Sequence, residues 1–153
     1  MRKEIEKRLV GFAISIVEIS KTLDGSFAST CLAHQIIRSG TSVAINYGEA
    51  QGAESRNDFI HKSSIVLKEL RETCINLQII KSTNLSKKPD LIEKALEESD
   101  QLLAIFHKTV MTARKNREKR CIFLFPFSKV HCPGDYAEYG QWTMDNVTIR
   151  FSP

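Results

Sequence analysis

Apolar residues recur along the start of the chain at alternating steps of three and four residues. The first series is Ile5, Leu9, Phe12, Ile16, Ile19 and Leu23. This rhythm places all its side chains on one face of an α-helix, as in helices that pack in bundles. We therefore expect a first helix over about residues 3–23. Asp24-Gly25-Ser26 follows with turn chemistry, since Gly accepts positive φ and the other two side chains can bond nearby backbone.

A second helix is predicted over about residues 28–47. Its apolar and small positions on one side of a helical wheel are Leu32, Ala33, Ile36, Ile37, Gly40, Val43, Ala44 and Tyr47. A glycine inside a helix lowers helix propensity by about 1 kcal/mol relative to alanine. Gly40 and Ala44 are four residues apart, so we expect a neighbouring helix to pack closely there. Gly48 and Gly52 flank the expected break after this helix.

The third and fourth helices repeat the pattern. Ser55 with Asp58 three residues on is typical of a helix start, and predicts a helix over about residues 56–81. Pro89 suits the first position of a fourth helix that continues to about residue 115. The two apolar faces consist of Phe59, Ser63, Val66, Leu70, Thr73 and Leu77, and of Ile92, Ala95, Ser99, Leu102, Phe106, Val110 and Ala113.

Four helices joined by short links favour antiparallel neighbours. The predicted fold class is therefore all-α, an up-down-up-down antiparallel four-helix bundle with an irregular or hairpin-like C-terminal tail. We expect the bundle to take residues 1–117 and the tail residues 118–153, because the composition changes after Arg120 and prolines and glycines follow. This appendage could pack on the bundle, bury in an oligomer contact, or be an added extension.

Composition and charge favour an ordinary globular chain. The 153 residues are 42% hydrophobic and 26% charged, with a net charge of +4. The cysteines, Cys31, Cys74, Cys121 and Cys132, form no CxxC pair. Reduced thiols and a cytoplasmic location are expected. The apolar run over residues 9–17 is too short to cross a bilayer, and we expect no membrane association.

Catalytic and metal-binding signatures are missing from the sequence. The four histidines, His34, His61, His107 and His131, have no HxxxH or HExxH spacing. No glycine-rich phosphate loop, nucleophile elbow or dinucleotide fingerprint occurs. We therefore predict a protein that is not an enzyme and that has no catalytic residues, no metal and no cofactor.

One end of the predicted bundle is basic. The topology brings together the start of the first helix, the link between the second and third, and the end of the fourth. The ten cations there are Arg2, Lys3, Lys7, Arg8, Arg56, Arg114, Lys115, Arg117, Lys119 and Arg120, and the six acids are Glu4, Glu6, Glu49, Glu54, Asp58 and Glu118. Favourable charge at a helix terminus explains part of this cluster, and nucleic-acid binding is the other explanation. No aromatic side chain for base stacking is expected here unless the tail supplies one, so phosphate contact is favoured.

The second helix also carries a polar stripe. Its members are Gln35, Arg38, Ser42, Asn46 and Glu49, which lie within roughly 80° on a helical wheel. The stripe is either a solvated face or a contact with another subunit or partner, and its spacing does not choose between these.

Several blocks of the sequence resemble the 23S rRNA intervening-sequence protein family of bacteria. They are Arg38-Ser39-Gly40-Thr41-Ser42-Val43-Ala44-Ile45-Asn46-Tyr47-Gly48-Glu49-Ala50, Glu54-Ser55-Arg56-Asn57-Asp58-Phe59-Ile60-His61-Lys62, Ser64-Ile65-Val66-Leu67-Lys68-Glu69-Leu70-Arg71-Glu72-Thr73, and Lys88-Pro89-Asp90-Leu91 with Glu98-Ser99. The likeness covers about residues 5–116. It implies a four-helix bundle that assembles as a ring-like homopentamer. The residues that resemble the family's signature positions are Arg38, Ser42, Asn46, Glu49, Arg56 and Phe59, none of them an established catalytic group.

A related branch, the accessory variability determinant proteins of diversity-generating retroelements, is a strongly basic pentamer that works with a reverse transcriptase and RNA. This chain is less basic than that branch. Charge and resemblance together predict a homo-oligomeric, pentameric scaffold that engages RNA or a ribonucleoprotein through repeated basic ends. The alternative is a protein-interaction module that binds a protein partner through the polar stripe of the second helix, without nucleic acid.

Overall fold

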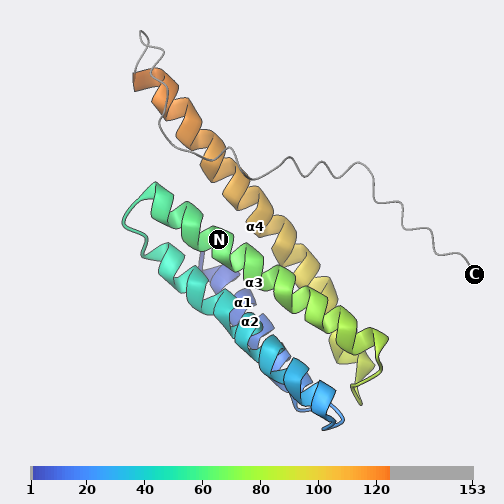
Figure 1. The fold of residues 1–153 in the computed structure, drawn as a ribbon. Coiled ribbons are helices and arrows are strands. Elements are labelled where there is room, and N and C mark those ends of the chain that lie inside the picture. The colour runs from blue at the N-terminus through green and yellow to red at the C-terminus, as the bar shows by residue number, and fades with distance from the viewer. Residues whose placement is uncertain (1, 125–153) are drawn as a thin grey trace, which may run out of the picture.

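The computed structural model describes the backbone of residues 2–124 and the side chains of residues 2–115. Four helices cover most of this range: α1 (Arg2–Ser20), α2 (Phe27–Gln51), α3 (Arg56–Ser82) and α4 (Pro89–Leu124). Each helix packs against its neighbours in chain order and α1 also contacts α4, which closes the bundle (Figure 1). The predicted all-α, up-down-up-down bundle is confirmed. The predicted tail beyond residue 124 lies outside the described residues.

Three helix ends differ from the prediction. α1 ends at Ser20, three residues before the predicted end. α2 continues past Gly48, whose conformation stays helical, and Gly52 is the residue that caps the helix. α4 continues past residue 115, and the expected boundary after residue 117 lies inside this helix. No glycine or proline interrupts the sequence until Pro126, so the helical backbone has no local reason to stop earlier.

Serine side chains fix the starts of two helices. The Ser55 hydroxyl accepts a hydrogen bond from the Asp58 backbone N–H at 3.1 Å, as its sequence predicts. Ser26 accepts in the same way from the Ser29 N–H at 3.2 Å. Asp24 adds a carboxylate that accepts from the Ser26 N–H at 2.9 Å, and Gly25 between them has a φ of 81°. These contacts satisfy N–H groups that a helix start would otherwise leave without partners.

The core draws on the apolar face of every helix. Its buried members are Leu9, Phe12, Ile16, Ile19, Ile36, Val43, Tyr47, Val66, Leu67, Leu70, Leu77, Ile80, Ile92, Ala95, Leu102 and Phe106. The predicted faces are therefore confirmed. The rings of Tyr47 and Phe106 meet edge to face, with centroids 5.7 Å apart, and join α2 to α4.

The two ends of the bundle are built differently. At the end formed by the α1–α2 and α3–α4 links, the Asp24 N–H donates to Leu85 O at 3.0 Å and the Lys87 N–H donates to Thr22 O at 3.0 Å. We call this the closed end. At the opposite end, which we call the open end, the α2–α3 link is the only connection between described helices, and it meets the start of α1 and the flank of α4. α4 then projects beyond the other helices (Figure 1). None of the described helices is long and apolar enough to cross a membrane.

Candidate nucleic-acid interface

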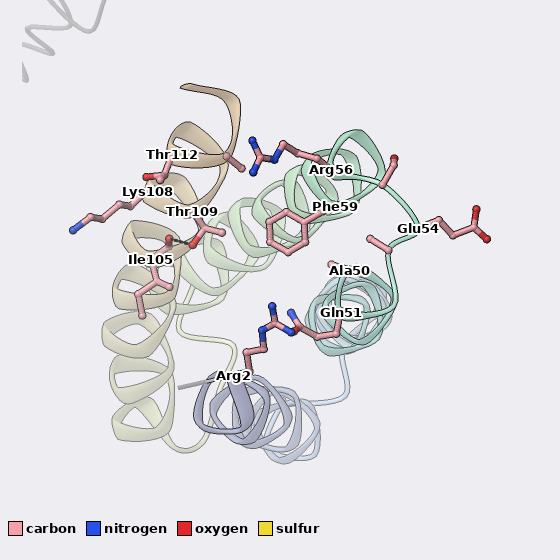
Figure 2. Close-up of a pocket in the computed structure, with 13 residues that line it drawn as sticks. Arg2, Ala50, Gln51, Glu54, Arg56, Phe59, Ile105, Lys108, Thr109 and Thr112 are labelled. Carbon is pink, nitrogen blue, oxygen red and sulfur yellow. Dashed lines mark hydrogen bonds between the residues drawn. The ribbon is translucent and has the colours of Figure 1, made fainter. Parts of the chain in front are cut away.

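A cavity of about 790 Å³ occupies the open end of the bundle. Its walls come from the start of α1, the end of α2, the α2–α3 link, the first turn of α3 and the later turns of α4 (Figure 2). The start of α1 and the α2–α3 link therefore meet as predicted, but they meet the flank of α4 at residues 105–113, and the end of α4 projects beyond them. Because the three chain segments converge there without a second link, space remains between them.

Two arginines line this cavity from different helices. Figure 2 shows the Arg2 guanidinium reaching in from α1 and the Arg56 guanidinium reaching from the first turn of α3 toward Thr112 on α4. Among the described side chains, no carboxylate forms an ion pair with either of them. Burial raises the pKa of Tyr47, and the charge of Arg2 opposes that rise. The cavity therefore holds two cations that form no ion pair with any described carboxylate.

Other charged groups on the cavity wall point away from it. Lys108 and Glu54 both line the cavity, and their charged ends extend outward in Figure 2. Asp58 is used locally, since its carboxylate accepts from the Glu54 backbone N–H at 3.3 Å. The positive charge nearest the cavity interior is therefore that of Arg2 and Arg56.

An aromatic ring lies between these arginines. Phe59 lines the cavity, and its ring stands near the centre of the view in Figure 2. The expectation that this end has no aromatic side chain unless the tail supplies one is wrong. Phe59 opens the apolar series of α3, and its N–H donates to Ser55 O at 2.9 Å, so the capped first turn places the ring at the mouth of the bundle. No turn of α3 precedes Phe59, so this helix does not cover the ring on that side.

The remaining predicted basic residues fall into three groups. Lys3, Lys7, Arg114 and Lys115 are exposed around the open end. The side chains of Arg117, Lys119 and Arg120 lie outside the part of the chain whose side chains are described. Arg8 is already occupied: its guanidinium makes two hydrogen bonds of 2.9 Å to the Glu98 carboxylate and a third of 2.9 Å to Gln101.

Arg8 therefore joins α1 to α4 within the chain. The hydrogen bonds to Glu98 raise the pKa of Arg8 above its ordinary value, and desolvation by burial opposes this rise. Both side chains are about one third exposed or less, at 29% and 31%. A bidentate pair in this setting neutralises Arg8 and makes it a poorer phosphate ligand than Arg2 or Arg56.

The polar stripe of the second helix lies along α2 on the side that faces α3. Arg38 pairs with Glu72, and Glu49 accepts from the Lys62 ammonium at 3.0 Å, which raises the Lys62 pKa. The Asn46 amide donates to Ser42 O within α2 at 2.8 Å. Gln35 is exposed. Two of the five stripe residues thus bind α3 of the same chain.

The described part of the chain offers little support for a metal site or for a cysteine pair. Within residues 2–115, no three His, Cys, Asp or Glu side chains gather as a metal site. Cys31 and Cys74 are free thiols on different helices, the first exposed and the second buried. Cys121, His131 and Cys132 lie outside the side chains that the structure describes.

Comparison with known proteins agrees with the blocks noted in the sequence. The model of the family described as "23S rRNA-intervening sequence protein" matches residues 2–108 of this chain. The chain belongs to this family. Comparison with curated proteins gives no match.

A solved structure supports the same family of intervening-sequence proteins. It is a protein of unknown function from the S23 ribosomal protein family of Bacteroides thetaiotaomicron, 31% identical to this chain with a TM-score of 0.63. The alignment covers 69% of this chain and 97% of that chain. Neither name states a catalytic activity. The family match includes Arg2, Arg56, Phe59 and Lys108, so most of the cavity wall lies within it.

Proposed function

We propose that this intervening-sequence protein is a non-enzymatic, homo-oligomeric bundle that acts as an RNA- or ribonucleoprotein-associated scaffold. The observation that carries the proposal is a set of cations around the open end that have no ion pair among the described side chains. Arg2 and Arg56 reach into the cavity, and Lys3, Arg114 and Lys115 are exposed near it. RNA phosphates bind such groups mainly through release of counterions, without base-specific contacts.

A pentameric assembly, which the family resemblance implies, would strengthen this binding. Repeating the open end in each subunit multiplies the positive field, although one chain carries a net charge of only +4. Val10 and Ile14 of α1 are 47% and 58% exposed, and Ile45 of α2 is 61% exposed. The antiparallel packing of α1 on α2 brings Val10 and Ile45 to about the same level. Exposed apolar side chains on two adjacent helices are suited to a contact between subunits.

The cytoplasm is the compartment that we propose for this assembly. Cys31 and Cys74 are free, and reduced thiols are typical of that compartment. The alternative function, binding of a protein partner through the α2 polar stripe, has less support because Arg38 and Glu49 already bind α3.

RNA binding by the full chain tests the proposal, measured as fluorescence anisotropy of a labelled structured RNA at a series of salt concentrations. The informative variant neutralises Arg114 and Lys115 as R114Q/K115Q. We expect weaker binding and a salt slope that falls by about one for each phosphate-binding cation removed. The matched control is K87Q/K88Q, which removes two exposed cations from the closed end.

Two outcomes would overturn the RNA assignment. One is undetectable binding at low salt. The other is equal binding by wild type, R114Q/K115Q and K87Q/K88Q, because the basic end would then contribute nothing particular. A pull-down that returns a protein partner, and that fails on substitution of Gln35 and Ser42, would favour the alternative.

A further inference from the structure

The open-end cavity combines three features that the proposed function does not by itself require. It has an aromatic ring in its interior, a guanidinium on either side of that ring in the view of Figure 2, and a volume of about 790 Å³. Phosphate contact alone needs only surface cations. A recess that presents a ring between two cations is suited to a ligand that is planar in one part and anionic in another.

Nucleotides have this combination of parts. A base has a π-face that stacks on an aromatic ring regardless of its identity, and the adjoining phosphates are ligands for guanidinium groups. Pockets for ligands of this size have volumes of about 300–1,000 Å³. Gln51 and Thr112 also line the cavity and carry polar groups that can bond a base edge. The chemistry of the wall therefore fits one nucleotide with its flanking phosphates.

The shape of the site favours a nucleotide from a single strand. Phe59, on the first turn of α3, faces the recess between the end of α2 and the flank of α4, and a base can stack on its ring only with one face free (Figure 2). In a duplex, each base face is covered by its neighbours, whereas unpaired bases in loops and single strands can be splayed out.

Another cavity in the described region does not compete for this role. It has a volume of about 450 Å³ and lies between α1 and α4. Its arginine, Arg8, is bound by Glu98, and its one aromatic residue, Phe12, is 2% exposed. That groove therefore offers neither a free guanidinium nor an open ring.

We propose that the open-end cavity receives a single unpaired nucleotide of an RNA strand, with its base on Phe59 and its phosphates on Arg2 and Arg56. This inference rests on the proposed RNA-binding function and names the kind of RNA element that the site takes. Stacking on the ring and phosphate contact with the guanidiniums do not depend on base identity, so any preference for a base would come from Gln51 and Thr112.

The experiment compares the full chain with two variants, F59L and R56Q. The probe is a short labelled single-stranded RNA of mixed sequence, alone and annealed to its complement, and adenosine monophosphate serves as competitor. The matched controls are F27L, since Phe27 is 87% exposed at the closed end, and R71Q, since Arg71 is an exposed arginine elsewhere on α3. Circular dichroism and thermal unfolding of each variant establish that it folds.

We expect F59L to weaken single-strand binding by about fivefold or more and to leave duplex binding unchanged, because the base no longer has a ring on which to stack. R56Q should weaken single-strand binding and lower the salt slope by about one. Both controls should bind like wild type. If F59L unfolds, R56Q and ultraviolet crosslinking of thiouridine-labelled RNA to wild type still test the site, with crosslinks expected at Phe59.

Several results would overturn the inference. RNA binding that survives both F59L and R56Q, or crosslinks confined to α4, would remove the cavity from the interface and leave the proposed function intact. Equal affinity for adenosine monophosphate and the single strand would remove the assignment to a nucleotide within RNA. Failure to bind any RNA would instead overturn the proposed function, and this inference with it.

Discussion

Ile16 of α1 packs directly against the backbone of Gly40 in α2. A Cβ atom built on Gly40 would lie 2.9 Å from both Cγ1 and Cγ2 of Ile16, closer than real side-chain contacts allow. Ile16 is fully buried, so it has no free space into which to move. The glycine therefore sets how closely α1 and α2 approach.

Gly40→Ala should lower the free energy of unfolding. Overpacking in a filled core destabilises by about 1–3 kcal/mol, which exceeds the gain of about 1 kcal/mol in helix propensity. Chemical denaturation followed by circular dichroism measures the difference. Gly48→Ala is the matched control, because a Cβ there meets nothing within 4 Å, and it should stabilise by up to about 1 kcal/mol.

The Gly40 clash can also be isolated by a double-mutant cycle. When Ile16→Ala is already present, the methyl group of Gly40→Ala has space, so the substitution should no longer destabilise. If Gly40→Ala destabilises the wild-type chain and the Ile16→Ala variant equally, the contact with Ile16 is not the cause.

A buried hydroxyl pair joins α2 to α3. The Thr73 hydroxyl donates to Ser39 Oγ at 2.8 Å, and the Ser39 hydroxyl donates to Gln35 O at 2.9 Å. Thr73→Val should destabilise by about 1–3 kcal/mol, because it leaves a buried serine oxygen with one partner fewer. Adding Ser39→Ala should restore part of the loss, and the measured denaturation midpoints should show this non-additivity. Independent, additive losses would mean that the two hydroxyls do not interact.

Stability at the closed end should depend on pH through Asp24. The backbone hydrogen bond from Ser26 is the largest cause that lowers the Asp24 pKa, and side-chain hydrogen bonds from Ser29 and Ser26 act in the same direction. A lowered pKa means that the stabilising contribution is present above the ordinary aspartate pKa. It is lost as pH falls through the lowered folded value.

Carbon-detected NMR titration of the Asp24 carboxyl group should give a folded pKa below that of an aspartate peptide. Asp24→Asn keeps an oxygen that accepts from the Ser26 N–H and has no titratable proton, so it should lose this part of the pH dependence. An Asp24 pKa at or above the peptide value would contradict the prediction.

Much of the bundle is readable from sequence because its determinants are local or periodic. Apolar spacing located the core, and Gly40 with Ala44 indicated a close approach that the Ile16 contact confirms. Helix ends were less predictable. Gly48 and Gly52 are the same residue type in similar contexts, and only the backbone hydrogen bond from Gly52 to Glu49 O, at 3.1 Å, distinguishes the cap.

The open-end cavity required the three-dimensional arrangement. The sequence predicts Arg2 and Arg56 at one end of the bundle, and it predicts Arg8 there as an equally available cation. The pairing of Arg8 with Glu98 is not evident from the sequence, because the two residues are ninety positions apart. Phe59 was assigned to the apolar face of its helix. Its position on the first turn of α3, with no preceding turn of that helix beside it, is the signal that could have identified it as accessible.

Assembly is tested best by solution mass. We expect light scattering of the full chain to give a pentamer, with Val10, Ile14 and Ile45 in the contact between subunits. Ile14 and Ile45 are more than half exposed, so Ile14→Lys and Ile45→Asp should leave the fold of one subunit stable. Each substitution would bury a charge between subunits, so the assembly should dissociate and its measured mass should fall. Ile75→Glu is the matched control, since Ile75 is 56% exposed on α3 and should leave the mass unchanged. A monomeric wild-type chain would remove the repeated basic ends from the proposed function, and a loss of mass only in Ile75→Glu would move the subunit contact to α3.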